Sequence, residues 1–137
     1  MVMGDFNAYS PFDADWVETH AQLIKNKQKW DAEQETYRNM RDGRLDYSVL
    51  SQFLSIGLTD ICRLYVPADK RTTFPTAFLY RWQHGDTRLH GISERLDYIL
   101  VSPSLVSRCV DAHIHNGIET EGISDHYPVR GDLVIHL

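Results

Sequence analysis

Short apolar runs and one alternating segment predict the strands of this chain. They cover residues 2–3, 58–66, 72–77, 95–102, 109–115 and 129–136. The run at 95–102 gives the strongest signal, and residues 109–115 alternate apolar with polar side chains, as a half-buried strand does. Val2 and Met3 are interpreted as the end of a buried strand that stops at Gly4.

Helical spacing of apolar residues predicts two helices. The first follows a turn that ends at Asp13, which is expected to cap it, and the second begins after Asp46 and stops at Gly57. Residues 31–45 are rich in charge and are expected to form a mobile loop or a frayed helix end, and residues 80–94 a long loop. Because strands outnumber helices and several follow one another directly, the pattern predicts an α+β fold with a mixed or antiparallel sheet.

Length and composition fit one domain with a core. The chain has 137 residues, of which 42% are hydrophobic. Its formal net charge of −5 provides no global basic field, which disfavours a sequence-independent DNA binder but is compatible with a nuclease that has a local basic rim. Cys62 and Cys109 are expected to be buried thiols, with a disulfide as the alternative. No apolar run reaches the length of a membrane span, and the sequence leaves the location of the protein open.

Three short acidic motifs contain the candidate chemistry. They are Gly4-Asp5-Phe6-Asn7, Arg95-Leu96-Asp97-Tyr98 and Ser124-Asp125-His126-Tyr127-Pro128. Each adjoins a predicted strand, where the functional side chains of α/β sheets collect. Taken singly, each motif is more often an ordinary turn, strand or helix cap. Their occurrence together favours a site that supplies carboxylates, an amide and an imidazole for the hydrolysis of a phosphate ester.

The residue types suggest a catalytic role for each of five side chains. Asp5 is expected to orient or deprotonate the attacking water, and Asn7, on the same side of an extended backbone, to bond the phosphate. Asp97 and His126 are expected to form a carboxylate–imidazole pair. Asp125 is expected to hold a metal ion or a metal-bound water, so Asp5 and Asp125 are the candidate metal ligands.

Two further groups of residues are weaker candidates. Tyr80, Trp82 and Arg88 stand in the predicted long loop, and an aromatic and basic loop of this kind either binds substrate or packs over the edge of the sheet. His113 and His115 share one face of a predicted strand, a spacing that can chelate zinc. A solvent-facing stripe is the favoured interpretation of the two histidines, since no third ligand is evident.

The three motifs, in this order, resemble the C-terminal signature of the endonuclease/exonuclease/phosphatase superfamily, which includes exonuclease III-type abasic-site nucleases. The resemblance covers essentially the whole chain and extends to Leu58-Thr59-Asp60 and Thr73-Phe74-Pro75-Thr76. It implies a Mg²⁺-dependent (or Mn²⁺-dependent) phosphodiesterase or nuclease that uses a metal-assisted water. Family domains are four-layer α/β/β/α sandwiches considerably longer than this chain. Residues 1–137 resemble the C-terminal half alone, which implies one sheet with helices on one face.

Two expectations follow from the resemblance to half of a domain. The half that contains the principal metal-binding glutamate is absent from this chain, so we expect weak metal binding and little or no activity for the chain alone. The sheet face that normally packs on the other half is expected to be exposed and apolar, and to drive formation of a homodimer or higher oligomer. The alternatives are the same chemistry on a phosphomonoester or lipid headgroup, and a non-catalytic, truncated interaction module.

Overall fold

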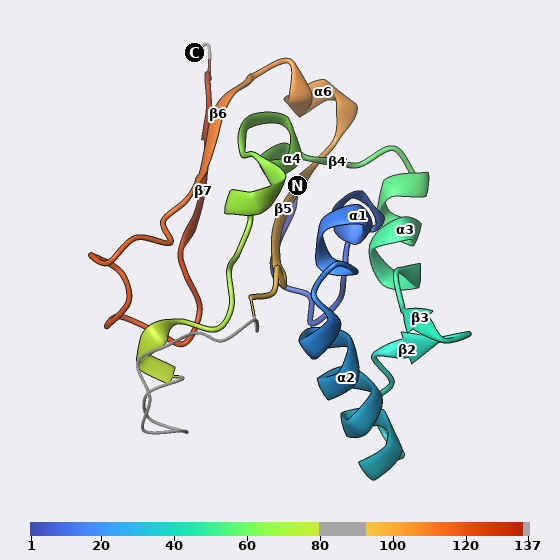
Figure 1. Ribbon diagram of the computed structural model, residues 1–137. Helices are drawn as coiled ribbons and strands as arrows, with labels where there is room; N and C mark the ends of the chain where they lie inside the picture. The colour runs from blue at the N-terminus through green and yellow to red at the C-terminus, as the bar shows by residue number, and fades with distance from the viewer. Residues whose placement is uncertain (80–92, 136–137) are drawn as a thin grey trace.

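The strands of the computed structural model, which describes residues 1–79 and 93–135, form small antiparallel sheets (Figure 1). They are β1 (Val2–Asp5), β2 (Met40–Arg41), β3 (Arg44–Leu45), β4 (Thr59–Asp60), β5 (Asp97–Val101), β6 (Cys109–Ile114) and β7 (Val129–Leu133). The largest sheet has the order β1-β5-β4, while β2 pairs with β3 and β6 pairs with β7. The predicted α+β class is therefore confirmed, but the strands of the described residues do not join into one sheet.

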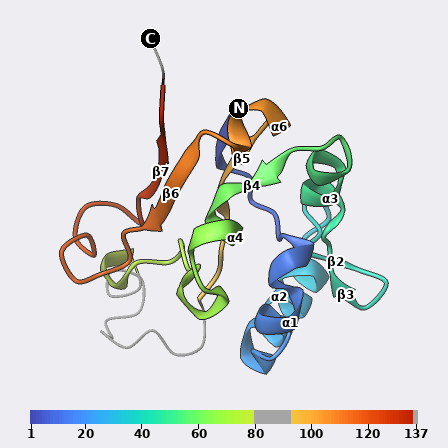
Figure 2. The same cartoon turned by 90° about the horizontal axis from the view of Figure 1, so that it is seen from above.

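Short helices surround these sheets. They are α1 (Ala14–Val17), α2 (Ala21–Glu33), α3 (Ser48–Ser55), α4 (Ile61–Tyr65) and α6 (Pro103–Val106), with 3₁₀ turns η1 (Pro11–Asp13) and η2 (Ala68–Lys70). In two views, β6 and β7 lie on one side of β5, and α1, α2 and α3 lie on the other (Figure 1, Figure 2). No helix among the described residues is long and apolar enough to cross a membrane.

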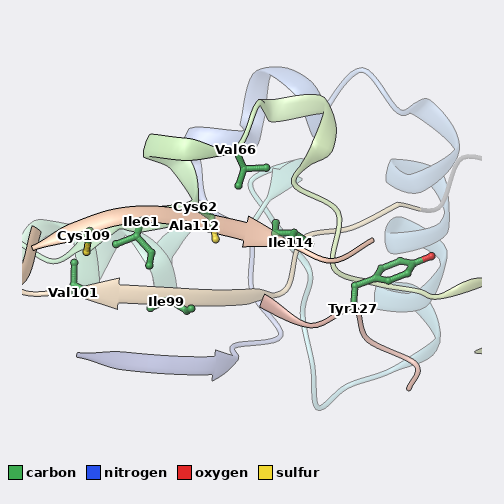
Figure 3. Packing of buried hydrophobic residues seen from close by; sticks show 9 residues of the cluster. All are labelled: Ile61, Cys62, Val66, Ile99, Val101, Cys109, Ala112, Ile114 and Tyr127. Carbon is green, nitrogen blue, oxygen red and sulfur yellow. The ribbon is translucent and has the colours of Figure 1, made fainter. Parts of the chain in front are cut away.

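Strand β5 is buried on both of its faces. Tyr98 and Leu100 pack with Leu50 of α3, whereas Ile99 packs with Ile61 of α4 and with β6 (Figure 3). A continuous apolar run such as β5 requires cover on both faces. The expectation of a large exposed apolar face is therefore wrong for β5, while the sandwich layering stays a prediction.

The exposed apolar surface of this sheet lies instead on its edge strand, β1. Val2 and Met3 are 40% and 60% exposed, so the prediction of a buried strand is wrong at this position. Strand β1 pairs only with β5 in the described part of the chain, which leaves its other edge without a partner strand.

Several sequence-based boundaries differ from the structure because local side-chain bonds decide them. Residues 58–66 form a two-residue strand and then α4, since the Asp60 carboxylate accepts a hydrogen bond from Cys62 N at 3.1 Å and caps that helix. Residues 31–45 extend α2 to Glu33 and then form the β2–β3 hairpin, which turns through Asp42 and Gly43 at positive φ. Of the two alternatives for this segment, the helix end is confirmed at residues 31–33, and the loop is wrong at residues 40–45, where the hairpin forms.

Other boundaries follow from backbone conformation and burial. Residues 72–77 contain only an isolated bridge between Phe74 and Glu94, so the strand predicted there is wrong. Gly57 adopts a φ of 88°, which confirms the predicted left-handed helix stop. Cys62 and Cys109 are both buried free thiols, as the sequence predicts.

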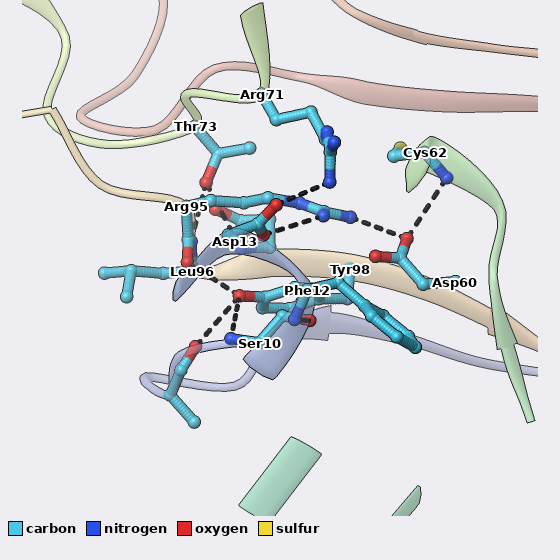
Figure 4. A network of polar contacts seen from close by, with 12 residues as sticks. Ser10, Phe12, Asp13, Asp60, Cys62, Arg71, Thr73, Arg95, Leu96 and Tyr98 are labelled. Atoms are coloured by element: carbon cyan, nitrogen blue, oxygen red, sulfur yellow. Dashed lines mark hydrogen bonds and ion pairs between the residues drawn. The ribbon is translucent and has the colours of Figure 1, made fainter. Parts of the chain in front are cut away.

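A buried network of charges connects η1 to the central sheet (Figure 4). Asp13 does not cap the following helix, and its two carboxylate oxygens contact Arg71 Nη1 at 2.5 Å and Arg95 Nη1 at 3.0 Å instead. Arg95 Nη2 also lies 2.6 Å from Asp60 Oδ1. Burial raises the pKa of Asp13, and the two guanidinium groups oppose that rise. This network fixes the backbone immediately before Asp97.

Candidate functional site

Asp5 and Asp97 are brought together by the pairing of β1 with β5. Asp5 is the last residue of β1, Asp97 is the first of β5, and the antiparallel register places them directly opposite each other. Opposed residues of an antiparallel pair point to the same face of the sheet, and like charges at such positions repel. A cation bound between the two carboxylates would relieve this repulsion.

His126 approaches the same point from the segment that precedes β7. Its Nδ1 lies 2.7 Å from Asp97 Oδ2, and both side chains are half-buried. The expected carboxylate–imidazole pair is therefore present. The imidazole also packs on the ring of Phe74, with 4.8 Å between ring centres. Two contacts thus hold the orientation of the His126 ring.

Asp5, Asp97 and His126 form a group that is suited to a divalent metal ion. Each offers one ligand atom, and these atoms lie within 4.8 Å of one another. Carboxylate oxygens suit Mg²⁺ and Mn²⁺, while an imidazole suits Mn²⁺ better than Mg²⁺. When Nδ1–H of His126 donates to Asp97, its Nε2 still has a lone pair for a metal or a substrate. The donor set therefore fits either ion, and this group is called the acidic cluster below.

Asn7 is held against Asp5 by two hydrogen bonds. Its backbone N donates to Asp5 Oδ1 at 2.8 Å, and its side-chain Nδ2 donates to Asp5 Oδ2 at 3.1 Å. Asn7 has a φ of 45°, a left-handed conformation that asparagine tolerates better than most residues. The expected extended backbone is therefore wrong at this position. The turn brings the amide back beside the carboxylate and leaves its second N–H available to a ligand.

Asp125 lies outside the acidic cluster, although it is adjacent in sequence to His126. Its Oδ1 accepts a hydrogen bond from Ser124 Oγ at 3.0 Å, and its carboxylate is exposed. Its backbone oxygen accepts from Thr76 N at 3.0 Å. The sequence suggested Asp5 and Asp125 as the metal ligands. The candidate metal group instead combines Asp5 with Asp97 and His126.

The segment of residues 73–76 holds the two halves of the carboxylate–imidazole pair in place. Thr73 Oγ1 accepts hydrogen bonds from the backbone N of Leu96 at 2.9 Å and of Asp97 at 3.2 Å. The Thr73 carbonyl accepts from Tyr127 N at 2.8 Å, next to His126. Thr73 therefore bonds to both segments that supply the pair. The only sequence signal for this role is the resemblance of Thr73-Phe74-Pro75-Thr76 to the superfamily.

One open hollow adjoins the acidic cluster, and a second adjoins Asn7. One reaches Asp97 and His126 and has mostly apolar walls, lined by Met3, Gly4, Tyr98, Ile99, Ser124, Tyr127, Pro128 and Val129. The other adjoins Asn7 and is lined by Ala8, Tyr9, Arg38, Asn39, Asp46 and Val49. Sequence reasoning missed Arg38 and Asn39, because the segment from 31 to 45 gave no signal beyond its high charge.

The remaining candidate residues and the comparisons add no further groups to the site. Tyr80, Trp82 and Arg88 lie outside the described residues. In comparisons with known proteins, no family model, no curated protein and no solved structure matched this chain. The chemistry of the site therefore rests on the acidic cluster and the residues in contact with it.

Proposed function

We propose that this chain supplies one wall of the catalytic site of a divalent-metal-dependent phosphoesterase, most simply a phosphodiesterase or nuclease. The observation that carries the proposal is the acidic cluster, in which two opposed carboxylates meet an imidazole held 2.7 Å from one of them. A bound Mg²⁺ or Mn²⁺ neutralises the negative charge that develops on the phosphate oxygens during hydrolysis.

Each residue of the site has a distinct part in this proposal. Asp97 accepts the Nδ1–H bond of His126, which fixes the ring and leaves Nε2 for a metal ion or the phosphate. Asp5 orients the attacking water or takes its proton. Asn7, held by Asp5, donates its second amide N–H to a phosphate oxygen. Asp125 stays a proposed outer residue that positions water.

The hollow beside Asn7 favours a phosphodiester of a nucleic acid over a phosphomonoester or a lipid headgroup. Arg38 and Asn39 line this hollow, and Arg41 and Arg44 follow on the β2–β3 hairpin. Arginine side chains beside a scissile phosphate can hold the next phosphate of a chain, which a monoester lacks. Arg38→Met is therefore expected to weaken binding of an oligonucleotide more than hydrolysis of a small phosphomonoester.

The donor set also supports the proposal that the site is completed by groups outside these residues. The cluster supplies three ligand atoms, about half of the six that surround Mg²⁺. We therefore propose weak metal binding and little activity for the chain alone. We propose that it forms the C-terminal half of a four-layer sandwich of the endonuclease/exonuclease/phosphatase kind, and that the unpaired edge of β1 promotes self-association. A non-catalytic interaction module is the second candidate, favoured by the same incomplete donor set.

Hydrolysis assays with matched variants test the proposed function. Abasic-site duplex DNA, a generic phosphodiester and an inositol phosphate are incubated with the protein and Mg²⁺ or Mn²⁺. Asp97→Asn and His126→Gln should each remove most of the activity, while His20→Gln, a change at a histidine whose ring contacts Trp16 and Thr19, should not. Measurable hydrolysis that is equal in wild type, Asp97→Asn and His126→Gln would contradict the proposal, and no hydrolysis by any of the three would favour the non-catalytic interaction module.

A further inference from the structure

A pair of histidines lies at the end of strand β6, outside the acidic cluster: His113 belongs to the strand and His115 follows it. Cys109, Ala112 and Ile114 of this strand are buried in the core, and His113 and His115 alternate with the buried residues. Their side chains therefore project from the opposite face of the β6–β7 hairpin. The exposure of His113 agrees with the solvent-facing stripe favoured from the sequence, but the two rings also lie next to each other.

The separation of the two imidazole rings matches a shared metal ion. Given metal–nitrogen distances of about 2.0–2.1 Å, two imidazoles on one ion have ring centres about 4.5 Å apart at a right angle and about 5.2 Å apart at the tetrahedral angle. The ring centres of His113 and His115 are 4.8 Å apart, and the ring planes are inclined by 63°. The distance falls within the chelating range without any movement of the backbone.

The backbone that carries the two rings is held on both sides. His113 pairs with Arg130 across the hairpin, and His115 N donates to the Pro128 carbonyl at 2.9 Å. The hydroxyl of Thr120 donates to the His115 carbonyl. The two Cα positions are therefore fixed before a ligand arrives, which reduces the entropy lost when both rings bind one ion.

The charged side chains around the pair largely neutralise one another. Asp111 and Asp132 lie on the same hairpin, and Arg130 Nη2 is drawn to them, at 2.8 Å from Asp132 Oδ2 and 3.8 Å from Asp111 Oδ2. The two carboxylates exceed the one guanidinium by a single negative charge. Among the described residues, no hydrogen bond engages a ring nitrogen of either histidine.

We propose that His113 and His115 form a bidentate site for a late first-row transition-metal ion, such as Cu²⁺, Ni²⁺ or Zn²⁺. Imidazole nitrogen binds these ions well and binds Mg²⁺ poorly, and Cu²⁺ forms the strongest complexes of the series. The site is separate from the acidic cluster, whose carboxylates suit Mg²⁺ and Mn²⁺. The chain therefore contains two metal sites of different ligand chemistry.

Copper binding to the full chain tests this site directly. One equivalent of Cu²⁺ is added near neutral pH, its affinity is measured against a competing chelator, and the bound nitrogens are counted by electron paramagnetic resonance. His113→Asn and His115→Asn should each reduce the nitrogen count from two to one and weaken binding about ten-fold or more, because the chelate is lost. His20→Asn is the matched control and should keep both nitrogens and the affinity, and His126→Asn tests whether the ion binds at the acidic cluster instead.

Other outcomes would overturn the proposal. Unchanged binding in His113→Asn and His115→Asn would place the ion elsewhere on the chain. Loss of binding in His126→Asn would assign the ion to the acidic cluster. Circular dichroism and thermal unfolding of each variant show that the fold is retained, as expected for substitutions on the outer face of a hairpin.

Discussion

Replacing Thr73 by valine should destabilise the protein by removing one hydroxyl from its interior. Valine keeps the shape of threonine, but Thr73 Oγ1 accepts hydrogen bonds from the backbone N of Leu96 and of Asp97, and Thr73 is 0% exposed. An unsatisfied buried donor costs about 1–3 kcal/mol, and the Asp97 N–H, on a half-buried residue, is expected to cost less than the Leu96 N–H. We expect Thr73→Val to lower the free energy of unfolding by about 2–4 kcal/mol.

Equilibrium unfolding in urea measures this loss. Thr72→Val is the matched control, because Thr72 is the neighbouring residue and its side chain forms no hydrogen bond in the described part of the chain. Thr73→Ser keeps the hydroxyl and should lose only what the deleted methyl group contributes, about 1 kcal/mol. A loss below about 1 kcal/mol for Thr73→Val would refute the role of this hydroxyl as a buried acceptor.

Three further predictions concern buried charges and thiols. Arg95→Met leaves Asp13 and Asp60 buried without their shared partner, so it should lower the free energy of unfolding in urea by about 3–5 kcal/mol. The control Lys70→Met removes an exposed ion pair and should lower it by under about 1 kcal/mol. Burial acts to raise the pKa of Asp31, but hydrogen bonds from Asn39 and Met40 outweigh burial and lower that pKa. The Asp31 carboxylate therefore stabilises the fold above pH about 3.9, and this stabilisation is lost as the pH falls through the folded-state pKa. Asp31→Asn should therefore be less stable than wild type at pH 7, and the difference should narrow in acid; a difference independent of pH would contradict the assignment. Burial raises the pKa of Cys62 to about 11, so a thiol reagent should modify Cys62 slowly in the native protein and quickly in denaturant. Equal rates of modification in both states would argue against a buried thiol.

The strongest elements of the fold could be predicted from the sequence because their signals are local. The apolar run of β5 and the alternation of β6 specify strands by themselves, and Gly57 marks a helix end by its freedom to adopt positive φ. The carboxylate–imidazole pair of Asp97 and His126 was also accessible, since both residues stand in recognisable motifs.

Other features depend on side-chain contacts that the apolar pattern does not contain, some of them local and some between distant segments. Asp60 turns an apolar run into a helix by capping it, and the turn at Asn7 brings its amide back to Asp5. Thr73 bonds to residues 23 and 24 positions away in the chain. Arg38 lines the hollow beside Asn7, although it stands in a segment whose charge suggested a loop.

The acidic cluster of Asp5, Asp97 and His126 is tested most directly by paramagnetic broadening of histidine ring signals with Mn²⁺. Small amounts of Mn²⁺ should broaden the ring signals of His126 before those of His20, because Mn²⁺ bound at the cluster lies within a few ångströms of the His126 ring. Asp5→Asn and Asp97→Asn should each weaken this broadening. Equal broadening of His126 and His20, or His126 broadening that both variants leave unchanged, would contradict a metal site at this cluster.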